Sequence, residues 1–158
     1  MRIVVLALVV VGLTACARGD GTAGAGDDET PAQFAMRITT LLRDGNFAAA
    51  WIDLHPEHQK LVTRSTLADC WTQTDDVLNN PDVELEVTAV ADEPWAIPGT
   101  SMTSPSKAIT VEASVPAEAG DRRVVLETWT QHAFDVEGEG WTWILAPALL
   151  ADARTNVC

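Results

Sequence analysis

This chain of 158 residues has no tyrosine and only two lysines, and its 10 basic residues stand against 23 acidic ones. The formal net charge is −13, and a domain this acidic repels phosphate backbones and anionic lipid head groups. We therefore expect neither nucleic-acid binding nor attachment to a bilayer through a basic patch. The sequence also has no Gly-x-Ser-x-Gly elbow, no Gly-x-x-x-x-Gly-Lys loop and no His-Glu-x-x-His pair, which argues against three common enzyme classes.

The chain has no apolar run long enough to span a bilayer. Its first run covers residues 3–11, whereas a spanning helix needs about 20 apolar residues. This run follows Met1-Arg2 and ends in small residues, a pattern that is typical of a secretory signal peptide. We therefore predict that residues 1–15 are a signal peptide.

The apolar run ends in Leu13-Thr14-Ala15-Cys16, which resembles the lipobox of bacterial lipoproteins. The resemblance implies that the sulfur of Cys16 receives a diacylglyceryl group and that cleavage makes Cys16 the N-terminus. Two acyl chains hold a protein stably on a membrane. We therefore expect a domain anchored by lipid to the outer face of the cell membrane. The alternative is ordinary signal cleavage, with Cys16 as a spare cysteine nearby.

Residues 16–29 have the composition of a flexible tether. After Cys16 they contain four glycines, three aspartates and one glutamate, with no large apolar residue. Such a segment buries too little surface to offset the entropy lost on ordering. We predict one globular domain over residues 30–158.

Lipidation of Cys16 would leave Cys70 and Cys158 in an oxidising compartment, where a disulfide between them is the expected pairing. The alternatives are a free buried thiol or a bond between two chains. Two lone cysteines without a nearby histidine do not make a zinc site, so we expect no metal.

Apolar residues at helical spacing predict three helices at the start of the domain. The first begins at Thr30-Pro31-Ala32-Gln33, which reads as a capping box with proline in the first turn, and ends at Asp44-Gly45. The second is capped by Asn46 and runs through Leu54. The third is capped by Ser65.

Beyond Val83 the apolar period changes to two, which predicts strands. A loop rich in proline, glycine and serine is expected over residues 94–106, and Gly138-Glu139-Gly140 is expected to form a hairpin turn. The expected strands cover residues 83–90, 109–115, 123–136 and 141–145. Helices followed by an antiparallel sheet define the α+β class.

Three segments together resemble the nuclear-transport-factor-2-like superfamily, also called ketosteroid-isomerase-like. They are Asp44-Gly45-Asn46-Phe47-Ala48-Ala49-Ala50-Trp51, Leu54-His55-Pro56-Glu57 and Gly140-Trp141-Thr142-Trp143. The resemblance covers about residues 30–147 and implies a cone: three N-terminal helices packed on a curved antiparallel sheet of about four strands.

Enzymes of this superfamily combine a carboxylate base with a phenol or a protonated acid in an oxyanion hole. This chain has no tyrosine, and its strand carboxylates alternate with apolar residues, as on a solvated face: Glu84, Glu86, Glu112 and Glu127. We therefore predict no catalytic residue and no cofactor. His55 and His58 are expected to be polar residues at a helix end. His132 shares one side of a strand with Thr128, Thr130 and Phe134, and is a base or ligand-orienting group if that side faces the cone interior; the alternative is a hydrogen-bonded sheet histidine.

Six tryptophans remain to be explained. They either build the core with satisfied indole N–H groups or line a cavity between helices and sheet. We single out Trp71, Trp95, Trp129 and His132 as contacts for a ligand or partner, with Trp95 expected in a loop. The expected function is a non-enzymatic, lipid-anchored domain that binds another envelope protein or a small apolar ligand. The alternatives are a cone-cavity enzyme or carrier, and a structural accessory subunit of an envelope complex.

Overall fold

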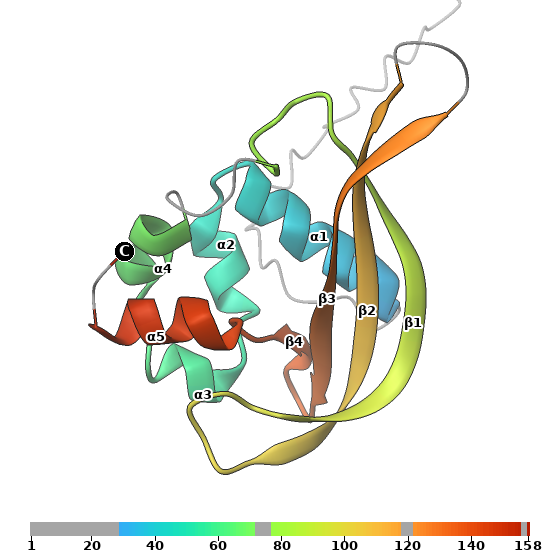
Figure 1. Cartoon of the computed structure of the whole chain (residues 1–158). Helices are drawn as coiled ribbons and strands as arrows, with labels where there is room; N and C mark the ends of the chain where they lie inside the picture. Colours follow the sequence, from blue (N-terminus) through green and yellow to red (C-terminus); the bar gives the residue numbers. More distant parts are fainter. Residues whose placement is uncertain (1–28, 72–76, 118–121, 156–157) are drawn as a thin grey trace, which may run out of the picture.

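Figure 1 presents a computed structural model, which describes residues 29–71, 77–117, 122–155 and 158. The predicted signal peptide (residues 1–15), Cys16 and all of the predicted tether except Glu29 lie outside these residues. Within the described part of the chain, no helix combines the length and the apolar character needed to cross a membrane.

The fold is α+β, as the sequence predicts, with five helices and one antiparallel sheet of four strands among the described residues. The strands lie in the order β1-β2-β3-β4. Figure 1 shows the helices gathered on one side of the curved sheet, with α1 against it. The elements are α1 (Pro31–Arg43), α2 (Phe47–Ile52), α3 (Pro56–Gln59), α4 (Arg64–Trp71), β1 (Glu84–Ala96), β2 (Thr103–Pro116), β3 (Arg123–Val136), β4 (Gly140–Trp143) and α5 (Pro147–Thr155).

The first helix begins as its sequence predicts. The hydroxyl of Thr30 accepts from the backbone N–H of Gln33, and the Gln33 side chain accepts from the backbone N–H of Thr30, which completes the capping box. One face of α1 is fully buried against the sheet and the other helices, through Phe34, Ile38 and Leu42. This helix therefore joins the two layers.

Two expectations about the helices are wrong. The third predicted helix begins at Arg64, and Thr63 rather than Ser65 caps it, because the Thr63 hydroxyl accepts from the backbone N–H of Thr66. The predicted count of three helices also misses α3 and α5. Both begin at a proline. With four residues, α3 is too short to show an apolar repeat, and α5 buries only Leu150 and Ala153, which do not form a clear repeat.

The expected loop over residues 94–106 is also wrong, because β1 runs to Ala96 and β2 starts at Thr103. Pro94 and Pro105 face each other across this hairpin. Proline is tolerated at both positions. Pro94 lies in β1, which is an edge strand, and Pro105 has no partner on β3, because the pairing of β2 with β3 starts only at Lys107. Trp95 consequently belongs to a strand and lies opposite Ser104.

One hydrophobic core holds the domain together within the described residues. It joins α1, α2 and α4 to β2 and to the segment from β4 to α5, through Ile38, Ala50, Leu67, Ile109 and Leu150 among others. Cys70 and Cys158 are paired at disulfide distance, with Cα atoms 4.7 Å apart. The bond links α4 to the last residue of the chain, so the folded unit contains its own core and cross-link.

Glu29 is bound to the domain. Its carboxylate accepts two hydrogen bonds from Arg37, of 2.8 and 2.9 Å, and its carbonyl accepts from the indole N–H of Trp141 at 2.9 Å. Arg37 also donates to Asp53 at 2.6 Å. The sequence places Glu29 in the tether, but in the structure it is part of an ion-pair network.

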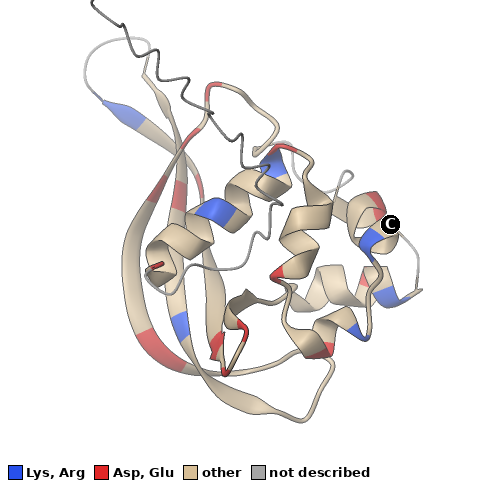
Figure 2. Cartoon of the chain, turned by 180° about the vertical axis from the view of Figure 1, so that it is seen from behind, with Lys and Arg blue, Asp and Glu red and all other residues tan. Residues whose placement is uncertain are grey.

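Basic side chains are sparse in the described part of the chain. Figure 2 shows the few Lys and Arg segments spread over several elements, among more numerous Asp and Glu segments. Arg123, at the start of β3, forms ion pairs with Glu84 and Glu86, at the start of β1.

Candidate ligand cavity

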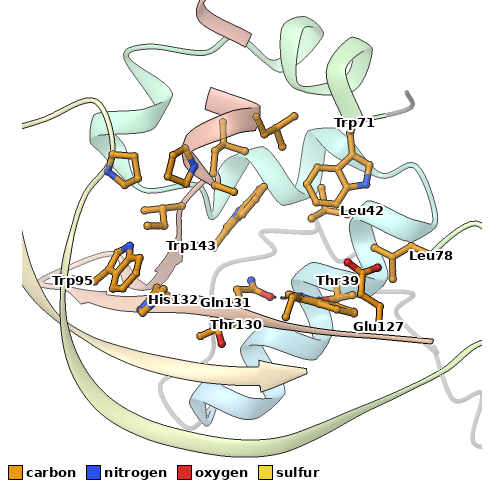
Figure 3. A pocket seen from close by; sticks show the side chains of 17 residues that line it. Thr39, Leu42, Trp71, Leu78, Trp95, Glu127, Thr130, Gln131, His132 and Trp143 are labelled. Carbon is orange, nitrogen blue, oxygen red and sulfur yellow. Dashed lines mark hydrogen bonds between the residues drawn. The ribbon is translucent and has the colours of Figure 1, made fainter. Parts of the chain in front are cut away.

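A cavity of about 300 Å³ lies between β3, α1, α4 and the segment that joins β4 to α5. Four tryptophans line it: Trp71, Trp95, Trp129 and Trp143. Figure 3 shows Trp95 and His132 together at one end, Trp71, Leu78 and Glu127 at the other, and Trp143 between them. We call this space the aromatic cavity.

The structure brings together the four contact residues that the sequence singles out. Trp71, Trp95, Trp129 and His132 all line the aromatic cavity. They come from three separate elements, α4, β1 and β3. The sequence does not identify Gln131 or Trp143 as site residues. In the sequence each is an ordinary strand residue, and only the fold places α4 and α5 across the cavity from them.

The tryptophans differ in whether their indole N–H is satisfied. Trp51 donates to Val62 O at 3.0 Å, and Trp143 donates to Ala50 O at 2.7 Å, as expected for core residues. Trp95 and Trp129 have no hydrogen bond to the described residues through their indole nitrogens. Trp95 is also 36% exposed, so it lies at the rim of the cavity.

His132 is held by contacts from the β1–β2 hairpin. Its ring stacks on Trp95 with centroids 4.0 Å apart, and its Nδ1 is 3.1 Å from the hydroxyl of Ser106. Burial lowers the pKa of His132, and the carboxylate of Glu93 opposes this only in part. Thr128 and Thr130 are exposed whereas His132 is buried, because the hairpin covers only this part of the strand face.

Gln131 lines the cavity and carries a buried polar atom without a partner. Its Nε2 is the one side-chain nitrogen or oxygen of the described residues that is buried without a hydrogen bond. The Thr39 hydroxyl lies 3.4 Å from Oε1, but its one proton goes to Ala35 O, which is closer at 2.9 Å. The amide is therefore weakly held, and such a group in a native protein calls for an explanation.

The other two histidines lie outside the cavity, and hydrogen bonds engage one ring nitrogen of His55 and both of His58. His55 caps α3, since its Nδ1 accepts from the backbone N–H of Glu57 at 3.2 Å. His58 is fully buried: its Nδ1 accepts from the N–H of Leu145, and its Nε2 donates to Pro98 O. Burial lowers the pKa of both rings. The described residues contain no cluster of three metal-binding side chains.

The polar groups around the cavity differ in whether they line it. The hydroxyl nearest to a base is that of Ser106, but it donates to Glu93 O at 2.6 Å and does not line the cavity. Glu127 is exposed, as the sequence predicts, and it also lines the cavity. The lining within the described residues includes no lysine or arginine.

No protein-family model matches this chain, and neither a curated protein nor a solved structure is significantly similar to it.

Proposed function

We propose that this chain is a lipid-anchored, extracytoplasmic binding domain whose aromatic cavity holds a small apolar ligand. The observation that carries the proposal is the cavity of about 300 Å³ with four tryptophans in its wall. Ligand sites in proteins are concave and mostly apolar, with a few polar groups that fix orientation. The unpartnered amide of Gln131 is such a group.

The superfamily resemblance and the observed class support the same proposal. We infer a nuclear-transport-factor-2-like cone from the three sequence segments that resemble that superfamily. The described helices on one side of a curved antiparallel sheet are compatible with it. A cone of this kind places its ligand between helices and sheet, where the aromatic cavity lies.

The cavity can be tested by filling it. Leu149 lines the cavity from α5, whereas Ala151 on the same helix is exposed. The chain from residue 16 onward, with Cys16→Ser, is incubated with envelope lipid extract and examined by native mass spectrometry. We expect a small-molecule adduct that Leu149→Trp removes and Ala151→Trp keeps. A bare mass for the unfilled protein would contradict the proposal.

The anchor is tested separately, on the full precursor in its host. We expect labelled palmitate to be incorporated into the wild-type chain and not into Cys16→Ser, which should remain as uncleaved precursor. Labelling of the variant would contradict the assignment of Cys16.

A second candidate function, binding of an envelope protein, is favoured by a different surface. Val124, Val125 and Leu126 are 44–49% exposed on β3, outside the cavity. A photoreactive residue at position 125 should then give one discrete protein adduct in the host envelope. The absence of such an adduct, together with a small-molecule adduct above, would leave the cavity as the functional site.

A further inference from the structure

We propose that His132 accepts a hydrogen bond through Nε2 from a neutral hydroxyl group of the ligand, so that the aromatic cavity selects hydroxylated apolar molecules. It would discriminate against plain hydrocarbons and against carboxylic acids. This inference rests on the proposed function and specifies the chemical class of its ligand.

The hydroxyl of Ser106 fixes which nitrogen of His132 carries the proton. A serine hydroxyl has one proton to donate, and that of Ser106 goes to Glu93 O at 2.6 Å. Its oxygen can therefore only accept from His132 Nδ1, which lies 3.1 Å away. In a neutral imidazole with the proton on Nδ1, Nε2 is an acceptor.

The neutral form of His132 is favoured by its surroundings. Only 7% of the residue is exposed, and Trp95 covers one face of the ring. No residue of the described part of the chain forms a hydrogen bond with Nε2, and His132 belongs to the cavity lining. Nε2 is therefore an acceptor that still has capacity for a donor from a ligand.

The charge of the cavity excludes an acid. Glu127 contributes a carboxylate to the wall, and the described lining has no basic residue to neutralise a second one. A carboxylic acid is ionised at neutral pH and has no proton to donate to Nε2 of His132, and the negative charge of Glu127 at the other end of the cavity also repels it. A hydroxyl group avoids this repulsion while still donating a hydrogen bond.

Gln131 adds the complementary partner. Its Nε2 is a buried donor without an acceptor in the described residues. A ligand hydroxyl both donates and accepts, whereas a hydrocarbon does neither. A ligand oxygen that reached the Gln131 amide would relieve this unpaired donor, as a contact separate from the one at His132.

The experiment compares three probes of one shape: naphthalene, 2-naphthol and 2-naphthoate. Binding to the chain from residue 16 onward, with Cys16→Ser, is measured by calorimetry at neutral pH. For the unmodified cavity we expect 2-naphthol to bind about tenfold more tightly than naphthalene, and 2-naphthoate to bind more weakly than either.

Two variants separate the hydroxyl contact from general packing. His132→Phe keeps the stacking on Trp95 but removes the acceptor, so the preference for naphthol should fall below about threefold. Ser106→Ala keeps the ring but no longer fixes its proton, so the preference should fall partway. Thr128→Ala, an exposed change on the same strand, should leave all three affinities unchanged.

The outcomes distinguish this inference from the proposed function. If naphthalene and naphthol bind equally well and His132→Phe changes neither, the hydroxyl contact is wrong while the cavity stands. If the unmodified protein binds none of the probes, both claims fail. If naphthoate binds most tightly, the proposed discrimination against carboxylic acids is wrong.

Discussion

Helix α1 contributes to two regions that differ in whether their polar groups have hydrogen-bond partners. Arg37 forms hydrogen bonds to Glu29 and Asp53 at 2.6–2.9 Å, so each charged group there has a partner. Two residues further on, Thr39 contacts the amide of Gln131. The Nε2 atom of this amide has no hydrogen-bond partner among the described residues. Burying an unpaired polar group costs about 1–3 kcal/mol. The paired region thus serves stability, and the unpaired region has the properties of a binding site.

The disulfide on the cavity side should give the largest effect. Cys70 precedes the cavity residue Trp71, and its bond with Cys158 closes a separation of 88 residues. Removing a native disulfide from a small domain typically lowers the free energy of unfolding by about 2–5 kcal/mol. We expect about 4 kcal/mol for Cys70→Ser in urea unfolding, and weaker ligand binding.

The double variant Cys70→Ser with Cys158→Ser is the control for this measurement. It should match the single variant, since neither retains the cross-link. Equal stability of the wild-type protein with and without reductant would contradict the pairing.

The paired region should show the next largest effect, without a change in ligand binding. In Arg37→Met the Asp53 carboxylate remains buried and unpaired, which costs about 3 kcal/mol. Arg43→Met is the matched control, because Arg43 lies in the same helix and forms only a surface ion pair with Asp44. Urea unfolding measures both. Similar losses in the two variants would show that the network is not a structural unit.

The helix-capping and strand signals of this chain are local, and they predicted most of the fold. The Thr30–Gln33 capping box and the glycine turn before β4 appear as expected. The errors have non-local causes. The hairpin that carries Trp95 looked like a loop because Pro94 and Pro105 break strand patterns, but an edge position tolerates them.

The site was predictable only in part, for a related reason. Large aromatic residues are conspicuous in any sequence, so Trp71, Trp95 and Trp129 could be named. Nothing in the sequence distinguishes Gln131 from a solvent-exposed glutamine. Its unpaired amide follows from packing against Thr39 on α1, a contact that spans 92 residues.

Mild acid should weaken the fold through its buried histidines. The pKa values of His55, His58 and His132 are lowered by burial from an ordinary value of 6.5. Below pH 6.5 these histidines bind protons in the unfolded chain but remain largely unprotonated in the folded protein. Stability is therefore complete above pH 6.5 and is lost as the pH falls toward the folded values.

We expect a loss of about 1 kcal/mol in the free energy of unfolding between pH 7 and pH 5.5. His58→Gln should be less stable overall but show a smaller loss over this range. The pKa of Asp53 is raised by burial, so its effect has the opposite sign and lies at lower pH, above its ordinary value of 3.8. Stability that rises on acidification to pH 5.5 would contradict the role of the histidines.

The smallest effect is the sharpest test of the contrast between the two regions. Gln131→Leu removes the unpaired amide and adds apolar surface to the cavity, so stability should rise by about 1 kcal/mol. Binding of a hydroxylated ligand should weaken at the same time, since the donor is gone. A gain in stability together with a loss of binding is the trade-off expected at functional sites. If Gln131→Leu instead destabilised the fold, the amide would have a structural partner, and the cavity would resemble the Arg37 network more than a ligand site.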